Sequence, residues 1–220
     1  MNAIIRFDHA TVAVRDKIIL SDISLTLLPG QKAVLSGKSG SGKSSLLKTV
    51  LGLLPVTMGR VYVHEIPLTS ISVQSIRQCA AYIGQEPMLG ADSVRAALLL
   101  PFQFKAHRGH KPTETQLTEV LQRLQLSKSI LNQACNRISG GEKQRIALAR
   151  GLLLGKRLYL LDEVTSALDA ESKHAVFNVF SDSQLTVLSV AHDPDWVERC
   201  SLVIQLENGQ VAEVKHCGNT

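Results

Sequence analysis

The fold of this chain is decided by the stretch Gly37-Lys38-Ser39-Gly40-Ser41-Gly42-Lys43-Ser44. The stretch matches the phosphate-loop pattern G-x-x-x-x-G-K-[ST] without a mismatch. Residues 32–36 in front of it have the pattern of a short buried strand, and residues 43–54 behind it place leucine and valine side chains on one side of a helix. A strand, a glycine-rich loop and a helix in this order predict a site for phosphate groups, whereas a flexible glycine–serine linker would lack the flanking elements.

The residue types of this loop are those that an anion requires. Gly37, Gly40 and Gly42 allow backbone angles that are closed to residues with side chains, so main-chain N–H groups can turn toward a phosphate. The helix that follows adds the positive end of its dipole. Lys43 supplies a mobile charge for the β- and γ-phosphates of a nucleotide, and the Ser44 hydroxyl is placed to hold Mg²⁺.

Length and composition indicate an ordinary globular protein. The chain has 220 residues, of which 45% are hydrophobic and 20% are charged, enough for a sizeable core in one domain. The apolar run 96–102 is too short to cross a bilayer, and residues 1–6 lack the layout of a signal peptide. We therefore expect a cytoplasmic protein. The net charge of +5 suits a nucleotide ligand or an anionic membrane surface and selects neither.

Hydrophobic periodicity predicts two kinds of structure along the chain. Alternating residues predict antiparallel strands within residues 4–28, at 4–7, 11–14 and 23–27. Further strands are predicted at 60–63, 80–85, 158–161, 186–190 and 202–206, with a type I′ turn at Asn208-Gly209. Strands that alternate with helices indicate an α/β fold with a mostly parallel sheet.

Residues 86–157 differ from the rest because they have helical periodicity, over 115–126 and 142–154. We expect this segment to be an α-helical subdomain inserted into the α/β core. The chain is then a single domain, 1–220, whose core consists of residues 1–85 and 158–220 and includes an N-terminal antiparallel β subdomain.

Two carboxylates end the predicted strand at 158–161. Asp162 stands where a carboxylate can reach Mg²⁺ directly or through water, and Glu163 can accept a proton from an attacking water. By itself the pair could simply end a strand and cap the next helix. Together with a phosphate loop, it favours a catalytic site.

The stretch Ile138-Ser139-Gly140-Gly141-Glu142-Lys143-Gln144-Arg145 is the most distinctive one. Ser139 and Glu142 have the S-x-x-E spacing of a capping box. Capping does not explain Gly140 and Gly141, because paired glycines in a first turn weaken a helix. They are explained if an anion must approach this backbone closely, so we predict a second helix N-terminus that receives phosphate.

These segments together resemble the ATP-binding cassette (ABC) ATPase domain, and the match covers nearly the whole chain. The family's motifs occur in its order: the phosphate loop at 37–44, the Q-loop glutamine Gln85, the signature loop at 138–142, the Walker B strand at 158–163, the D-loop at 166–169 and the switch histidine His192. The resemblance implies a P-loop NTPase that uses ATP and Mg²⁺.

In that family two cassettes enclose two ATP molecules head to tail. The resemblance implies that one face of an ATP is bound by Gly37, Lys38, Ser39, Gly40, Ser41, Gly42, Lys43, Ser44 and Ser45. The other face would be closed by Ser139, Gly140, Gly141 and Glu142 of a second copy. Mg²⁺ would be held by Ser44, Gln85 and Asp162. Glu163 would be the general base, with Gln85 and His192 completing the catalytic set, and His192 would contact the γ-phosphate.

Two departures from the family pattern bear on activity. Val14 stands near the position where family members carry an aromatic residue that stacks on adenine, a contact worth ~1–3 kcal/mol, which puts adenine selectivity and ATP affinity in question. Ile138 and Glu142 replace the commoner leucine and glutamine of the signature. For these we expect an altered rate rather than lost activity.

Within the family, the chain is similar to the stand-alone ATPase subunits of bacterial transporters, in particular the iron-export type. This implies peripheral attachment to the cytoplasmic face of the inner membrane, with a second copy and an integral membrane permease as partners and no nucleic acid. The alternative is a soluble ABC ATPase that does mechanical work on nucleic acid or the ribosome. The interval 45–138 is too short for the coiled coil of DNA-repair members, and ribosome-acting members carry two cassettes. A P-loop kinase would need neither Ser139-Gly140-Gly141 nor His192.

In the family, the segment after the Q-loop glutamine meets the permease, so we expect that contact within residues 86–111. The apolar run 96–102 either receives a helix of the permease or packs inside the helical subdomain. The basic residues Lys105, Arg108 and Lys111 either lie near anionic lipid head groups or stay solvated.

Overall fold

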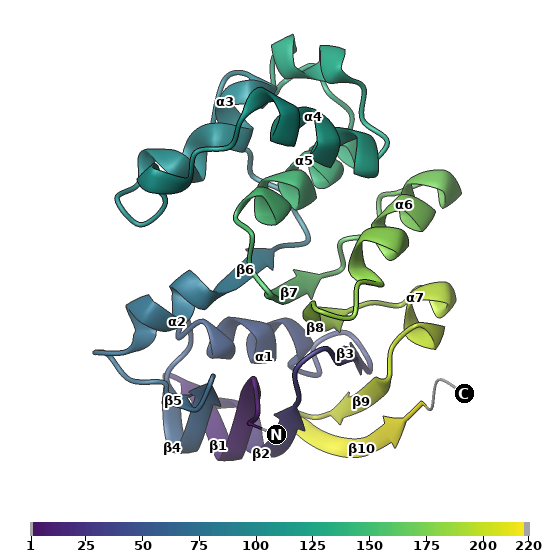
Figure 1. Cartoon of the computed structure of the whole chain (residues 1–220). Coiled ribbons are helices and arrows are strands. Elements are labelled where there is room, and N and C mark those ends of the chain that lie inside the picture. The colour runs from purple at the N-terminus through teal and green to yellow at the C-terminus, as the bar shows by residue number, and fades with distance from the viewer. Residues whose placement is uncertain (1, 218–220) are drawn as a thin grey trace.

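The computed structural model describes residues 2–217, which form two sheets with helices packed between and above them (Figure 1). The first sheet is antiparallel, with the strand order β2-β1-β4-β5. Its strands are β1 (Ile5–Val14), β2 (Lys17–Leu27), β4 (Val56–Val63) and β5 (Ile66–Pro67). The predicted antiparallel N-terminal sheet is therefore confirmed.

One detail of this sheet was predicted wrongly. The expected strands 4–7 and 11–14 are a single strand, β1, whose register shifts between Phe7 and Ala10. The shift is a bulge at His9, which has a φ of 49°. Opposite the bulge, a Cβ on Gly59 would lie 2.0 Å from the carbonyl oxygen of His9. The bulged strand therefore requires a glycine on its neighbour.

The second sheet contains the strands that carry the phosphate loop and the acidic pair. Its order is β10-β9-β3-β8-β7-β6, and all its neighbours are parallel except β9 and β10. Its strands are β3 (Lys32–Ser36), β6 (Ala80–Ile83), β7 (Leu158–Asp162), β8 (Thr186–Val190), β9 (Leu202–Glu207) and β10 (Gln210–His216). The mostly parallel sheet is confirmed. Asn208 and Gly209 both have positive φ, as the predicted type I′ turn between β9 and β10 requires.

Alternate residues of the parallel strands face two separate cores. On β7, Leu158 and Leu160 pack in a core with α1 (Lys43–Val50) and the antiparallel sheet, while Tyr159 and Leu161 pack in a second core with the helices on the other face. Every residue of β7 and β8 is buried. Strands covered on both faces read as continuous apolar runs, which is why β7 and β8 could be predicted from the sequence.

The elements between β6 and β7 are all helical and lie above the sheets in Figure 1. They are α3 (Val94–Leu99), η1 (Leu100–Gln103), η2 (Arg108–His110), α4 (Glu114–Arg123), η3 (Lys128–Asn132) and α5 (Gly140–Leu153). The predicted helices at 115–126 and 142–154 correspond to α4 and α5. A Cβ on Gly151 would lie 3.0 Å from Ile83, so α5 packs directly on β6.

Outside the helical segment, three helices were not predicted: α2 (Val73–Cys79), α6 (Ala170–Phe180) and α7 (Pro194–Glu198). The predicted helix 43–54 was too long, since α1 ends at Val50 and the chain turns at Gly52, where φ is 61°. Within residues 2–217, none of the helices has the length and apolar content needed to span a bilayer.

The apolar run 96–102 is largely interior. Leu98 is fully buried, and Phe102 is only 5% exposed, so these side chains belong to the core of the helical segment. This burial favours the alternative in which Leu98 and Phe102 pack inside the helical subdomain, while Leu99 and Leu100 are half-buried. Phe104, two residues further on, is 60% exposed.

The central strand β8 supplies a test of this packing. We expect Leu188→Ala to lower the free energy of unfolding by about 2–5 kcal/mol, because Leu188 is fully buried and its truncation leaves a cavity. The matched control, Val214→Ala on β10, should change it by about 0.5 kcal/mol or less, because Val214 is 41% exposed. Urea denaturation of both variants measures the difference, and equal effects would contradict the assignment of the core.

Candidate functional site

The phosphate loop connects the carboxyl end of β3 to the first residue of α1. Gly37, Gly40 and Gly42 all have positive φ, as expected from the sequence. At Gly37 a side chain is also excluded by space, because a Cβ would lie 2.2 Å from the carbonyl oxygen of Leu206 on β9. Nothing lies within 4 Å of a Cβ on Gly40, so the tip of the loop is open toward an incoming ligand.

The charge of Lys43 faces the inside of this loop. Its Nζ donates hydrogen bonds to the carbonyl oxygens of Gly37 (2.8 Å) and Lys38 (3.0 Å), and the residue is 6% exposed. No acidic side chain pairs with it among residues 2–217. The Ser41 hydroxyl is buried and has no hydrogen-bond partner in the same part of the chain. An unpaired cation and an unpartnered hydroxyl in one loop fit an anionic ligand.

Asp162 ends β7 beside the start of α1. Its Oδ1 accepts a hydrogen bond from the Ser44 hydroxyl (2.9 Å), and its Oδ2 accepts one from the Tyr82 hydroxyl (3.3 Å). The aspartate is 4% exposed. Burial, followed by the charge of Asp162, raises the pKa of Tyr82 to about 12, so Tyr82 remains a donor. Adjacent hydroxyl and carboxylate oxygens are the donor set that Mg²⁺ prefers.

Glu163 is held by residues that follow the strands on either side of β7. The Gln85 amide donates a hydrogen bond to Glu163 Oε2 (2.9 Å), and Nε2 of His192 lies 3.7 Å from Glu163 Oε1. Glu163 itself has a φ of 51° and donates its backbone N–H to the carbonyl of Val190 at the end of β8. This backbone conformation is uncommon for a residue with a side chain, and here it turns the carboxylate between its two partners.

The signature stretch starts α5 with the predicted capping box. The Ser139 hydroxyl accepts the Glu142 N–H (3.2 Å), and Glu142 Oε2 accepts the Ser139 N–H (2.8 Å). The backbone hydrogen bond from Ser139 lowers the pKa of Glu142 and keeps it charged. Gly140 has open space around it, and a Cβ on Gly141 would lie 3.2 Å from the carbonyl oxygen of Ala167. Within residues 2–217, no hydrogen bond or ion pair joins Ser139, Gly140, Gly141 or Glu142 to residues 37–45.

Three residues near the site were given no role of their own by the sequence analysis. Tyr82 lies on β6 and shares a face of the sheet with Asp162, since it is paired with Leu160. Gln144, which is 2% exposed, donates to the carbonyl of Gly84, and Arg150 donates to the carbonyls of Met88 (3.0 Å) and Leu89 (2.9 Å). Both hold α5 against the chain on either side of Gln85. Gln144 and Arg150 could have been noticed in the sequence, because they are polar residues among the apolar residues of a predicted helix.

Val14 lies at the end of β1, in the hairpin that leads to β2. It is 39% exposed, and Ile18 on the facing strand is 61% exposed. β2 continues toward the phosphate loop, where the carbonyl oxygen of Ile19 would lie 3.2 Å from a Cβ on Gly42. The hairpin therefore offers aliphatic rather than aromatic side chains beside the loop.

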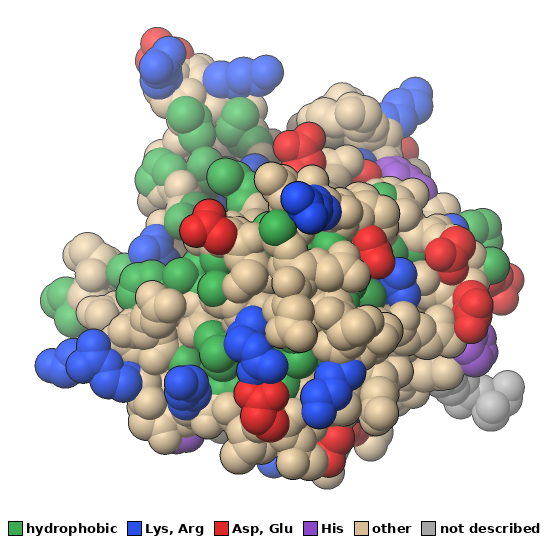
Figure 2. Space-filling view, turned by 90° about the horizontal axis from the view of Figure 1, so that it is seen from above, with side chains coloured by type: hydrophobic (Ala, Val, Ile, Leu, Met, Phe, Trp, Pro, Cys, Tyr) green, Lys and Arg blue, Asp and Glu red, His purple; other side chains and the backbone are tan. Residues whose placement is uncertain are grey.

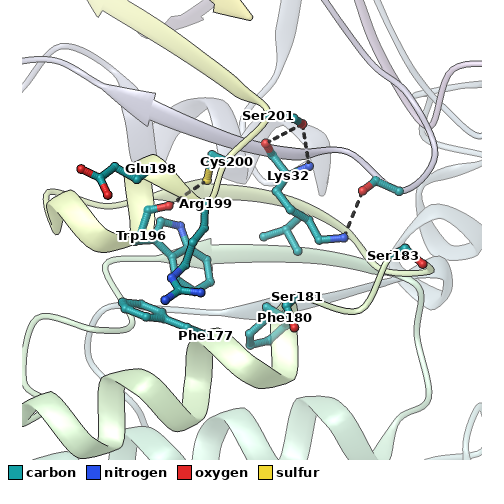
Figure 3. A pocket seen from close by; sticks show the side chains of 12 residues that line it. Lys32, Phe177, Phe180, Ser181, Ser183, Trp196, Glu198, Arg199, Cys200 and Ser201 are labelled. Carbon is teal, nitrogen blue, oxygen red and sulfur yellow. Dashed lines mark hydrogen bonds between the residues drawn. The ribbon is translucent and has the colours of Figure 1, made fainter. Parts of the chain in front are cut away.

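A cavity of about 380 Å³ lies away from these residues, between α6, α7 and the start of β3 (Figure 3). Its apolar walls come from Phe177, Phe180 and Trp196. Lys32, the first residue of β3, uses its ammonium group on the carbonyls of Gly30 (3.0 Å), Asp182 (2.7 Å) and Leu185 (2.5 Å). Because the phosphate loop follows the other end of β3, this cavity is not part of the phosphate site.

Comparisons with known proteins agree with this geometry. The family model described as ABC transporter matches residues 20–166. The chain is 35% identical over 207 residues to the "Probable iron export ATP-binding protein FetA" of Escherichia coli (strain K12), covering 91% of each chain. It is 31% identical to the "ATP-dependent lipid A-core flippase" of Acinetobacter baylyi, covering 95% of this chain but 38% of that protein.

Among solved structures, the chain resembles the dimeric ATP-binding cassette MJ0796 in a post-hydrolysis state with ADP and Pi. The TM-score is 0.87 at 26% identity, over 98% of this chain and 100% of that one. The family model covers well over half of the sequence and includes both the phosphate loop and the acidic pair of β7. From the geometry of the loop and these matches we conclude that the chain belongs to the ABC transporter family and is one of its ATP-hydrolysing cassettes.

Proposed function

We propose that this cassette is the energy-coupling subunit of a membrane transporter, and that it works as a head-to-tail dimer with a separate permease. The observation that carries the proposal is the position of Glu163, held between Gln85 and His192 beside the phosphate loop (2.9 and 3.7 Å). A carboxylate oriented by an amide and an imidazole is suited to taking a proton from water.

The residues divide into those that bind phosphate and those that act on water. Lys43 and the backbone of residues 37–45 bind the phosphates. Ser44, Asp162 and Gln85 would hold Mg²⁺, whose positive charge would offset the negative charge of the phosphates. Glu163 accepts the proton of the attacking water. His192, 60% exposed in its side chain, contacts the γ-phosphate.

The second half of each site comes from another copy. Ser139 and Gly140 are exposed at the start of α5, and neither bonds to the phosphate loop of its own chain within residues 2–217. A helix N-terminus with open space at Gly140 is suited to receive a phosphate. The likeness to the dimeric cassette MJ0796 supports the same arrangement here.

The permease contact is assigned to residues 86–111, within a helical subdomain of residues 86–157 on the core of residues 1–85 and 158–220. Met88 is 84% exposed and Phe104 is 60% exposed. The exposed residues Lys105, Arg108 and Lys111 lie close to Phe104 in the sequence and are suited to anionic lipid head groups. The name of the similar protein, "Probable iron export ATP-binding protein FetA", supports iron as the transported substrate. We place the permease on a separate chain and this cassette on the cytoplasmic face of the inner membrane.

The alternative of mechanical work on nucleic acid gains no support from the face seen in Figure 2. Lys and Arg side chains there are interspersed with Asp and Glu side chains and with apolar ones. Nucleic-acid binding favours basic residues gathered on one face. The similarity to FetA over 91% of each chain favours the transporter.

Replacing the base tests the chemistry. We expect Glu163→Gln to bind ATP as the unmodified protein does but to lower kcat by about 10²-fold or more, because an amide cannot accept the proton. The variant should accumulate as an ATP-dependent dimer, measured by hydrolysis assays and sedimentation with Mg-ATP. Turnover close to that of the unmodified chain would remove Glu163 from this role.

Mixing variants tests the shared site. Lys43→Ala and Ser139→Arg should each be nearly inactive alone. Mixed dimers contain one intact composite site, so part of the ATPase activity should return on mixing. A strictly monomeric form as active as the dimer would refute the arrangement.

The permease surface can be tested without touching the ATP site. Phe104→Asp, and separately Lys105, Arg108 and Lys111 all changed to Glu, should abolish co-purification of the permease and leave basal ATPase activity unchanged. Phe104 is chosen because Phe102 is buried and its replacement would disturb folding. The control, Lys215→Glu on the exposed strand β10, should co-purify normally. Normal co-purification of both test variants would place the contact elsewhere.

A further inference from the structure

An ion pair beside His192 has no part in the site described above. Nζ of Lys173, on α6, lies 2.5 Å from Oδ2 of Asp193, and the two side chains are 31% and 10% exposed. Asp193 directly follows His192 in the chain and caps α7, since its Oδ1 accepts the backbone N–H of Asp195 (3.1 Å). A carboxylate this well buried depends on its cation, because removing one partner leaves an uncompensated charge.

Lys173 and Asp193 share a cavity with the catalytic residues. The cavity has a volume of about 300 Å³, and its walls include Glu163, Ser166, Lys173, His192 and Asp193. Burial acts to raise the pKa of Asp193, but the hydrogen bond and charge of Lys173, with the N–H groups of Trp196 and Asp195, lower it overall. Asp193 is therefore ionised at neutral pH and keeps its contact with Lys173 in this cavity.

A direct role in binding phosphate does not suit Lys173. Its ammonium group is occupied by Asp193, and the same cavity contains the carboxylate of Glu163. A phosphate entering beside Lys173 would meet both carboxylates. The remaining role for Lys173 is structural: it connects α6 to Asp193 at the start of α7.

The ion pair of Lys173 and Asp193 joins two segments that have further contacts of their own. On one side, the Ser166 hydroxyl donates to the carbonyl of Glu163 (2.9 Å), and Asp169 caps α6 through the N–H of Ser172 (2.8 Å). The segment 163–169 and the first turn of α6, which carries Lys173, are thus joined by hydrogen bonds.

On the other side, α7 is fixed to the sheet through Trp196. The indole N–H of Trp196 donates to the Ser189 hydroxyl on β8 (2.9 Å). His192 lies between this anchor and the end of β8, next to Asp193. The ion pair closes a ring of contacts that runs from Glu163 through α6 to Asp193 and back through His192 to Glu163.

We propose that Lys173 is a positioning residue for ATP hydrolysis: by holding Asp193, it fixes the backbone that places His192 against Glu163 and the γ-phosphate. The inference rests on the proposed function, because it assigns Lys173 to the hydrolytic step at Glu163. Binding of ATP by the phosphate loop does not involve the pair. Its loss should therefore lower kcat and leave KM nearly unchanged.

The test is a double-mutant cycle on the ATPase activity of the full chain. Lys173→Met removes the cation, and Asp193→Asn removes the anion while keeping an oxygen that can cap α7. We expect each to lower kcat by about tenfold with KM for Mg-ATP within twofold. The double variant should be no slower than the slower single one, because the two residues act as a unit. Lys173→Arg should recover most of the activity.

Lys215→Met is the matched control. It removes a lysine from an exposed pair with Glu213 on β10 (3.1 Å), far in the sequence from α6 and α7, and should leave kcat unchanged. Rates are expressed per folded chain, with urea midpoints measured for every variant, so that a loss of folded protein is not read as a loss of catalysis.

The proposal is wrong if either single variant has the kcat of the unmodified chain, or if KM rises without a change in kcat. It is also wrong if the two single effects multiply in the double variant, or if Lys173→Arg is as slow as Lys173→Met. The proposed function is judged separately. If the unmodified chain hydrolyses ATP and Glu163→Gln does not, that function stands whatever the ion pair does.

Discussion

Hydrogen bonding between parallel neighbours β3, β8, β7 and β6 is the constraint on which the site depends. In this register Ile83 is paired with Leu161, and Asp162 with Val190, so the turns that follow the four strands lie side by side at one edge of the sheet. Each turn contributes one part of the site. The phosphate loop follows β3, His192 follows β8, Glu163 follows β7 and Gln85 follows β6. The register is specified because both faces of β7 and β8 are buried, and a shift by one residue would exchange the two cores.

The helical segment is connected to this edge by polar groups as well as by packing. Gln144 holds α5 to the carbonyl before Gln85, and Arg150 holds the carbonyls of Met88 and Leu89 after it. Burial of Arg150 lowers the pKa of its guanidinium, which shows that the contact is made at a desolvation cost. Met88 is exposed, so the surface proposed to meet a permease is bonded to the same helix that supports Gln85.

Much of the fold was accessible to sequence reasoning because its signals are local. The strands 32–36 and 186–190 match β3 and β8 to the residue, since fully buried parallel strands are short apolar runs between turns. The capping box at Ser139 and Glu142 was predicted from two residues three positions apart and is confirmed. Helices α2 and α7 were missed because they are short, with seven and five residues. Helix α6 has eleven residues and was missed although its apolar residues Ala175, Val176, Val179 and Phe180 are buried on one side of it. The bulge at His9 was missed because it depends on how β1 pairs with β4.

By itself, the sequence determined the chemistry: a phosphate loop, an acidic pair and a glycine-rich helix start, each recognisable from residues that adjoin one another. Only the tertiary structure decided which of these groups touch. Ser44 and Tyr82 share Asp162, and Gln85 and His192 hold Glu163, across sequence separations that no local pattern encodes. The sequence gives no sign that Lys173 and Asp193 are partners. In the structure, α6 and α7 bring Lys173 Nζ to 2.5 Å from Asp193 Oδ2. The physical reason is that such contacts arise from the packing of strands and helices remote in the chain, and packing is set by the whole core rather than by any one segment.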